Sequence, residues 1–272
     1  MNQTTRSSGG WLRRAVAFAC PLIIAQGLWA TDSEILVTST LDSDAGSLRA
    51  AILAANAETA DTVTIKFSLG SVVPNIHLDT ALPDITREVT IDATDQVDDS
   101  GLPLVRIDGS HLVSADIFAV RAADVRIQGL QIAGGSASGN GVSVFGAANA
   151  RIMQNIIVSN GGYGIALTDA TGAHIEGNRI GLDAKGALAG NGVAILVTTA
   201  GTTEATTNVV IGGTTETQRN VISGNGNGIN LVNVSHNQVL GNYIGTDING
   251  GRARISALTN RYLSHPEMTL SH

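Results

Sequence analysis

Two short phrases recur between about Gly139 and Gly250, and they constrain the fold more than any other feature of this sequence. One phrase is Gly-Asn-Gly followed by Val or Ile, and a degenerate copy of it reads Gly-Tyr-Gly-Ile. Its second glycines are 23, 28 and 36 residues apart, at Gly141, Gly164, Gly192 and Gly228. The other phrase is Asn-x-Ile, and its asparagines are Asn155, Asn178, Asn220 and Asn242. Repeats at periods of about 20 to 50 residues indicate stacked supersecondary units.

The apolar residues within each unit alternate with other residues, as in Val193, Ile195 and Val197. A period of two is typical of a β-strand, and no helical period competes with it in this stretch. No segment between the strands is long enough for a crossover helix, so each strand is expected to pair with its counterpart in the next unit. The predicted fold is therefore all-β, a parallel β-helix over residues 61–251.

The repeated glycines and asparagines are interpreted as structural residues of the turns between sheets. Glycine accepts positive φ where the chain turns sharply, and this is the role expected of the four phrase glycines. Asparagines at equivalent positions of successive coils can stack as an amide ladder, which is the role expected of Asn155, Asn178, Asn220 and Asn242. Ligand binding by these asparagines is the less favoured alternative, because structural asparagine is routine in such turns.

The amino terminus has a different composition. Residues 1–30 contain Arg13 and Arg14, then an apolar stretch, then Ala30, which is the order of a secretory signal peptide. A lipoprotein signal at Cys20 and twin-arginine export are the alternatives. We therefore expect a secreted or cell-surface protein that meets a membrane only during export. Cleavage after Ala30 would leave no cysteine, and 13 basic against 23 acidic residues, a formal charge of −10. Such a charge disfavours a nucleic-acid partner.

Residues 31–60 are predicted to form an N-terminal cap made of a strand and a helix. Leu48, Ala51, Ile52 and Ala55 have the spacing of one apolar helix face, and Ser47 can cap the helix start. A helix laid across the first coil would cover the open end of a solenoid. The alternative is a surface helix of a small separate domain. Residues 252–272 lack the glycine and asparagine punctuation, and we expect a truncated or disordered tail there.

The segment from Val37 to Ile52 resembles the amino-terminal motif of the CSLREA-domain proteins, which are exported bacterial proteins. Ser47, Leu48 and Arg49 match the motif, whereas Gly46 stands in place of its cysteine and Ala50 in place of its glutamate. The resemblance extends over about residues 35–250. It implies a right-handed parallel β-helix of the pectate-lyase-like fold group, and export. It implies no common activity, so it supplies no catalytic residues.

We searched the acidic residues for the sites that polysaccharide enzymes need. A lyase of this fold needs carboxylates that hold calcium, and a hydrolase needs paired carboxylates. Four aspartates have repeat-related positions, with one pair expected in neighbouring coils and one in equivalent turns: Asp92 with Asp108, and Asp183 with Asp247. Asp169 aligns with Asn233. Asp95, Asp98 and Asp99 could form a calcium loop, but their spacing matches no known ligand pattern. Turn aspartates are routinely structural, so all of these are interpreted as turn residues.

Basic and aromatic residues give no convergent site either. The arginines are predicted to scatter, at Arg106, Arg121, Arg126, Arg151 and Arg179. His174 and His236 fall at different points of the repeat, which argues against a two-histidine metal site. Tyr163 and Tyr243 lie in different parts of their coils, and with Tyr262 they form no shared sugar-binding platform. No cofactor is expected, with calcium as the one ion left open.

The predicted function is that of a surface or extracellular structural or adhesive module, with carbohydrate or cell-surface components as partners. The alternative is a polysaccharide lyase or glycoside hydrolase, which requires acidic and basic side chains that converge on one sheet face.

Overall fold

The computed structural model describes residues 31–70, 73–201, 206–251 and 269–271. The predicted signal peptide (1–30), Tyr262 and most of the predicted tail (252–272) lie outside the described residues. Within the described part of the chain, no helix has the length and apolar run that a membrane-spanning helix needs.

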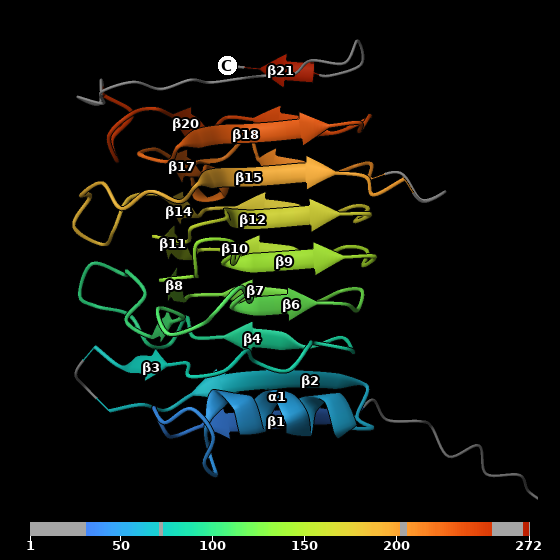
Figure 1. The fold of residues 1–272 in the computed structure, drawn as a ribbon, viewed down its shortest axis with the longest axis vertical. Helices are drawn as coiled ribbons and strands as arrows, with labels where there is room; N and C mark the ends of the chain where they lie inside the picture. Colours follow the sequence, from blue (N-terminus) through green and yellow to red (C-terminus); the bar gives the residue numbers. More distant parts are fainter. Residues whose placement is uncertain (1–30, 71–72, 202–205, 252–268, 272) are drawn as a thin grey trace, which may run out of the picture.

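The strands form three parallel sheets that stack along the long axis of the molecule, and sheet C begins only at β6 (Phe118–Val120) (Figure 1). Sheet A contains β1 (Asp32–Val37), β2 (Thr62–Phe67), β4 (Thr90–Asp92), β7 (Arg126–Gln128), β10 (Arg151–Met153), β13 (His174–Glu176), β16 (Val210–Gly212), β19 (Gln238–Leu240) and β21 (Thr269–Ser271). Sheet B contains β3 (Asn75–His77), β5 (Arg106–Asp108), β8 (Gln131–Ala133), β11 (Ile156–Val158), β14 (Arg179–Ile180), β17 (Val221–Ile222) and β20 (Tyr243–Ile244). Sheet C contains β6 (Phe118–Val120), β9 (Val142–Phe145), β12 (Tyr163–Thr168), β15 (Val193–Thr198) and β18 (Asn227–Val232).

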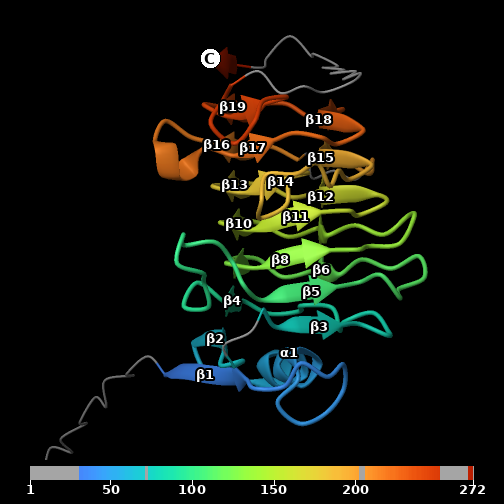
Figure 2. The ribbon, with the colours of Figure 1, turned by 90° about the vertical axis from the view of Figure 1, so that its left-hand side faces the viewer.

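From β4 to β18 each coil passes through the sheets in the order A, B, C and then rises to the next coil, whereas the chain from β1 to β3 passes through sheets A and B alone. In Figure 1, sheet A lies at the back, sheet B on the left and sheet C at the front, and Figure 2 shows sheet B face on. A chain that runs from back to left to front while it rises forms a right-handed coil. The predicted parallel β-helix is therefore confirmed.

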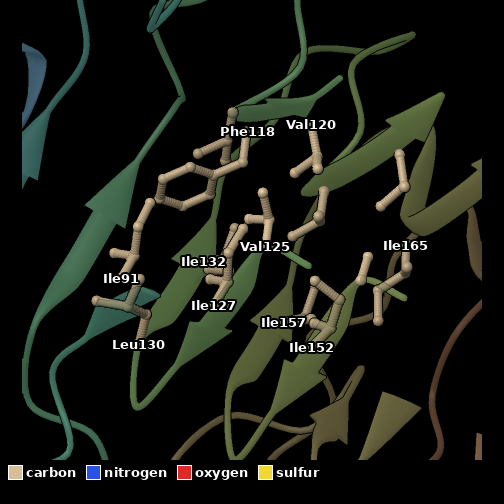
Figure 3. Close-up of a cluster of buried hydrophobic side chains, with 14 of the residues drawn as sticks. Ile91, Phe118, Val120, Val125, Ile127, Leu130, Ile132, Ile152, Ile157 and Ile165 are labelled. Atoms are coloured by element: carbon tan, nitrogen blue, oxygen red, sulfur yellow. The ribbon is translucent and has the colours of Figure 1, made fainter. Parts of the chain in front are cut away.

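The core is a set of aliphatic columns, one from each sheet. Side chains alternate between the two faces of a strand, so β7 of sheet A directs its middle side chain inward, whereas β6 of sheet C directs its two end side chains, Phe118 and Val120, inward. Ile91, Ile127 and Ile152 pair in register along sheet A, and all are at most 1% exposed. Ile132 and Ile157 of sheet B and Ile165 of sheet C meet them in the interior (Figure 3). Burial of each such side chain stabilises the fold by about 1.5–3 kcal/mol.

The predicted N-terminal capping helix is also confirmed. Helix α1 (Leu48–Ala57) packs on β1 and β2 at the N-terminal end of the solenoid (Figure 2). Its buried residues are those of the predicted apolar face: Leu48, Ala51, Ile52 and Ala55. Ser47 caps the helix, because its side chain accepts a hydrogen bond from the amide of Ala50 at 3.2 Å. Arg49 donates to the carbonyls of Thr80 and Ala81, which ties the helix to the next coil.

The expectation that the phrase glycines have positive φ is wrong, and the four glycines do not all lie at one level of the solenoid. Gly141, Gly164 and Gly228 share one level of sheet C, but β15 has Ala194 at that level, two residues after Gly192. The loops differ in length between coils, so equal phrases do not fall at equal positions. None of the four glycines has positive φ. Gly141 and Gly164 instead approach the next coil closely, because a Cβ on either would lie 2.7 Å from a carbonyl oxygen of the coil above.

Candidate functional site

The four predicted ladder asparagines stack at the turn between sheets A and B. The side-chain oxygen of Asn178 accepts from the amide of Asn155 at 3.0 Å and from its Nδ2 at 3.2 Å. Asn220 binds Asn178 in the same way, and Asn242 binds Asn220. Each Nδ2 also donates to a strand carbonyl below it, such as that of Ile152 for Asn178. The side chains thus join successive coils, and a ligand would have to break these bonds to use them.

A second ladder, which the sequence phrases do not reveal, lies at the turn between sheets B and C. Asn160 binds the side-chain oxygen of Asn191, and Asn191 binds that of Asn225. All three residues are at most 6% exposed. Asn191 belongs to a Gly-Asn-Gly phrase, but its equivalence to Asn160 and Asn225 cannot be read from the copies of that phrase, because they do not fall at equal positions of the coils.

Most candidate carboxylates hold their own turns. Asp98, Asp183 and Asp247 each begin a five-residue loop in which one carboxylate oxygen accepts two backbone amides, from the residues two and four positions later. The carboxylate of Asp169 accepts the amide of Ala200, and both Asp169 and Asn233 have positive φ. These aspartates are turn residues, and the structure does not bring any of them together as a catalytic pair.

Asp92 and Asp108 were expected in neighbouring coils, and this is wrong: they end β4 and β5, two strands of the same coil on different sheets. Asp92 forms an ion pair with Lys66 at 2.8 Å, and Lys66 also binds Asp95 at 2.7 Å. Burial raises the pKa of Asp92, but hydrogen bonds from Lys66, Thr94 and Gln128 outweigh it and hold the pKa at about 2. The same two carboxylates raise the pKa of Lys66. Asp95 is thus engaged by a lysine.

Asp108 lies in a small charged cluster on the outer face of sheet B. His77 and Arg106 approach its carboxylate at 3.5 and 3.7 Å. Burial raises the pKa of Asp108, but the amide and hydroxyl of Ser110 and the two nearby bases outweigh burial and lower the pKa. The ring of His77 stacks on that of His111, with 5.8 Å between centroids. A second carboxylate, Asp79, lies at the edge of this cluster, where it pairs with His111 at 3.1 Å. Each of the two carboxylates is therefore paired with basic side chains, Asp79 with His111 and Asp108 with His77 and Arg106.

The prediction that the arginines scatter is wrong for Arg126 and Arg151. They are direct register partners on the outer face of sheet A, and His174 continues the same column in the next coil. The remaining three arginines are separate from this column: Arg106 is on sheet B, Arg179 begins β14, and Arg121 lies over the ring of Phe145. We call Arg126, Arg151 and His174 the basic column.

A groove lies over the turn between sheets A and B, and the residues that line it do not include those of the basic column. Its floor includes Gly129, Gln154 and Gly177, and it has a volume of about 740 Å³. Its walls are the 94–103 loop and the segment around η1 (Glu216–Gln218), which project from the same side of the solenoid in Figure 2. Arg179 and Arg219 also line it. Arg219 is fixed there by stacking on Tyr243 at 4.3 Å and donating to its hydroxyl at 2.9 Å.

Tyr163 and Tyr243 do not form a shared platform, because Tyr163 is on sheet C and Tyr243 is on sheet B. His236 lies two residues before β19, whereas His174 begins β13, so their levels in the repeat differ. Within residues 31–70, 73–201 and 206–251, no three histidine, cysteine or acidic side chains gather as a metal site would require. Comparison with known proteins gives no identity, because neither a protein-family model nor a curated protein matches the chain.

Proposed function

We propose that this chain is an exported bacterial β-helix protein of the CSLREA-like kind, which acts as an extracellular adhesive module and binds glycans without cleaving them. The observation that carries this proposal is the lining of the groove. Among the described residues that line it, Glu216 is the single carboxylate, beside Arg179 and Arg219. A hydrolase needs two carboxylates flanking the bond, so this groove has the side chains of a binding site and not of a hydrolase site.

The scaffold supports the same reading. Carboxylates that recur in the repeat, such as Asp183 and Asp247, are committed to backbone amides of their own loops. The polar side chains between coils, such as Asn178 and Asn191, are hydrogen-bonded to the next asparagine of their ladders. A rigid solenoid with an open groove positions a long ligand well, and it offers few free groups for proton transfer.

One observation favours the enzyme alternative, a polysaccharide lyase or glycoside hydrolase. Sheet A carries acidic and basic side chains on one face, including Asp92, Arg151 and Glu176. Both of these carboxylates are already paired, Asp92 with Lys66 at 2.8 Å and Glu176 with His174 at 2.8 Å. A catalytic carboxylate would have to leave such a pair, so we give binding the priority.

The test is a binding and turnover assay on a panel of neutral and acidic polysaccharides, with and without calcium. We expect saturable binding to at least one glycan and no new reducing ends or unsaturated products. A substitution in the groove wall, Arg219→Ala, should weaken binding, whereas Arg87→Ala, near the N-terminal cap, should not. Turnover that requires calcium would refute the proposal and favour the lyase.

A further inference from the structure

Arg126 and Arg151 occupy equivalent positions in adjacent coils. Their Cα atoms are register partners, as are those of Arg151 and His174. Neighbouring strands lie about 4.8 Å apart, so the two guanidinium groups start from backbones that are one strand spacing apart. The buried residue that follows each arginine, Ile127 or Ile152, places the arginine on the outer face of the sheet.

Neither arginine is neutralised by a neighbour. Within the described residues, no hydrogen bond, ion pair or ring contact involves the side chain of Arg126 or Arg151, although both are partly buried. In the coil after Arg151, Glu176 is on the same strand as His174, and its carboxylate binds His174 at 2.8 Å. By contrast, Lys66 on the same face has two carboxylate partners.

Two like charges directly opposite each other destabilise a sheet. The scaffold therefore carries an electrostatic cost at this point and gains no internal contact from it. Local features that break a stability rule without a compensating contact are expected at functional sites. A bound anion between the two guanidinium groups would remove the repulsion and form charge-assisted hydrogen bonds with both.

We propose that Arg126 and Arg151 bind a carboxylate or sulfate group of an acidic glycan that lies along the groove. This inference rests on the proposed glycan-binding function and adds its ligand class and the residues that select it. Gly129 and Gln154 of the groove floor each follow one of these arginines by three residues. Three residues of strand span about 10 Å. The outward-facing Gln128 and Met153 lie between the two arginines and the groove floor, so a glycan in the groove would reach the arginines by extending across this row of sheet A.

An acidic glycan fits the charges better than a nucleic acid does. The chain has a formal net charge of −7, and a continuous phosphate backbone would meet repulsion over most of the surface. Single strands are also held by base stacking on aromatic side chains, and aromatic residues are only 3% of the sequence. A glycan with one charge per sugar or per disaccharide needs few cations, and two adjacent arginines supply them.

The experiment compares the wild-type chain with Arg126→Gln/Arg151→Gln, using polygalacturonate, dextran sulfate and neutral dextran as probes in titration calorimetry. Arg87→Gln/Arg121→Gln is the charge-matched control, because it also removes two arginines, one near the N-terminal cap and one that lies near Phe145 on the sheet C side. We expect the double variant to lose roughly tenfold to one hundredfold in affinity for an acidic probe, since hydrogen bonds to charged groups are the stronger kind. The control should bind within about twofold of the wild type.

Thermal unfolding without ligand separates this role from a structural one. Removing the repulsion should leave the melting temperature of Arg151→Gln unchanged or raise it, whereas a stabilising arginine would lower it. Unchanged affinity of the double variant, or a lowered melting temperature with lost binding, would overturn the inference. Tighter binding of polyglutamate than of either acidic glycan would also overturn it, in favour of an acidic protein. If the acidic probes and neutral dextran all bind the wild type and the double variant with the same affinity, the glycan-binding proposal stands and this inference fails.

Discussion

The substitution Asn178→Ala tests how much the first ladder stabilises the solenoid. Asn178 is 1% exposed and lies in the middle of the ladder. Its oxygen accepts two hydrogen bonds from Asn155, and its Nδ2 donates to the carbonyl of Ile152 at 2.7 Å and to Asn220 at 3.0 Å. The substitution removes all four bonds and leaves the amide of Asn155 buried without its acceptor.

The expected loss follows from these bonds. A buried donor left without a partner costs about 1–3 kcal/mol, and each ordinary hydrogen bond contributes about 0.5–1.5 kcal/mol net. One unpaired donor and three further lost bonds give a loss of roughly 2.5–7.5 kcal/mol in the free energy of unfolding. Asn242→Ala is the comparison, because Asn242 is only partly buried and water can replace part of what is lost. We expect about 1–2 kcal/mol there.

Urea unfolding followed by circular dichroism measures both losses, and hydrogen exchange locates them. In Asn178→Ala the amide of Asn155 should exchange faster than its neighbours, because its acceptor is gone. Asn178→Asp should be at least as damaging, since an acceptor would then face the carbonyl of Ile152. A loss below about 1 kcal/mol for Asn178→Ala, with an unchanged Asn155 amide, would refute the reasoning that the ladder holds the coils together.

Three further predictions concern the ion pair, one turn and the cap. The pKa of Asp92 is about 2, against an ordinary 3.8, so its pairing stabilises the fold above about pH 4. This contribution is lost as the pH falls from about 4 towards 2. The difference in unfolding free energy between the wild type and Asp92→Asn should therefore shrink over that range in acid titrations of unfolding. Gly129→Ala should destabilise more than Gly146→Ala in thermal melts, because both have positive φ but only at Gly129 would the Cβ meet backbone, 2.6 Å from the amide nitrogen of Thr94; equal shifts would contradict this. Leu48→Ala removes a fully buried side chain of α1 and should cost about 2–5 kcal/mol, with exchange increasing first in β1 and β2; exchange that increases only in α1 would argue against a capping role.

The fold could be predicted from the sequence because a solenoid repeats its local chemistry. Asn155 and Asn178 occupy the same position in two copies of the Asn-x-Ile phrase, so their stacking can be predicted from the phrase alone. The second ladder could not be found in this way, since Asn160, Asn191 and Asn225 lie 31 and 34 residues apart in phrases that differ. Loops of unequal length change the number of residues between equivalent positions of successive coils. The pairing of the strands is needed to show which residues are equivalent.

The basic column was missed although the sequence carries a signal for it. Arg151 and His174 each lie four residues before a ladder asparagine, and Arg126 lies four residues before Leu130, whose amide binds Asn155. Counting back from the ladder would have placed all three side chains at one level of sheet A. The spacing among the arginines alone was uninformative, because Arg106, Arg121 and Arg179 belong to other faces.

The ladder and the basic column are linked through the register of the strands. A slip of one residue in any strand pair would turn the outward side chains of that strand inward. Asn155 and Asn178 hold the coils of β10 and β13 at one fixed offset, through bonds that a slip would break. The offset that aligns the asparagines also aligns Arg151 with His174. The internal amides thus fix the spacing of the external cations, and a ligand with regularly spaced charges meets groups whose positions are set before it binds.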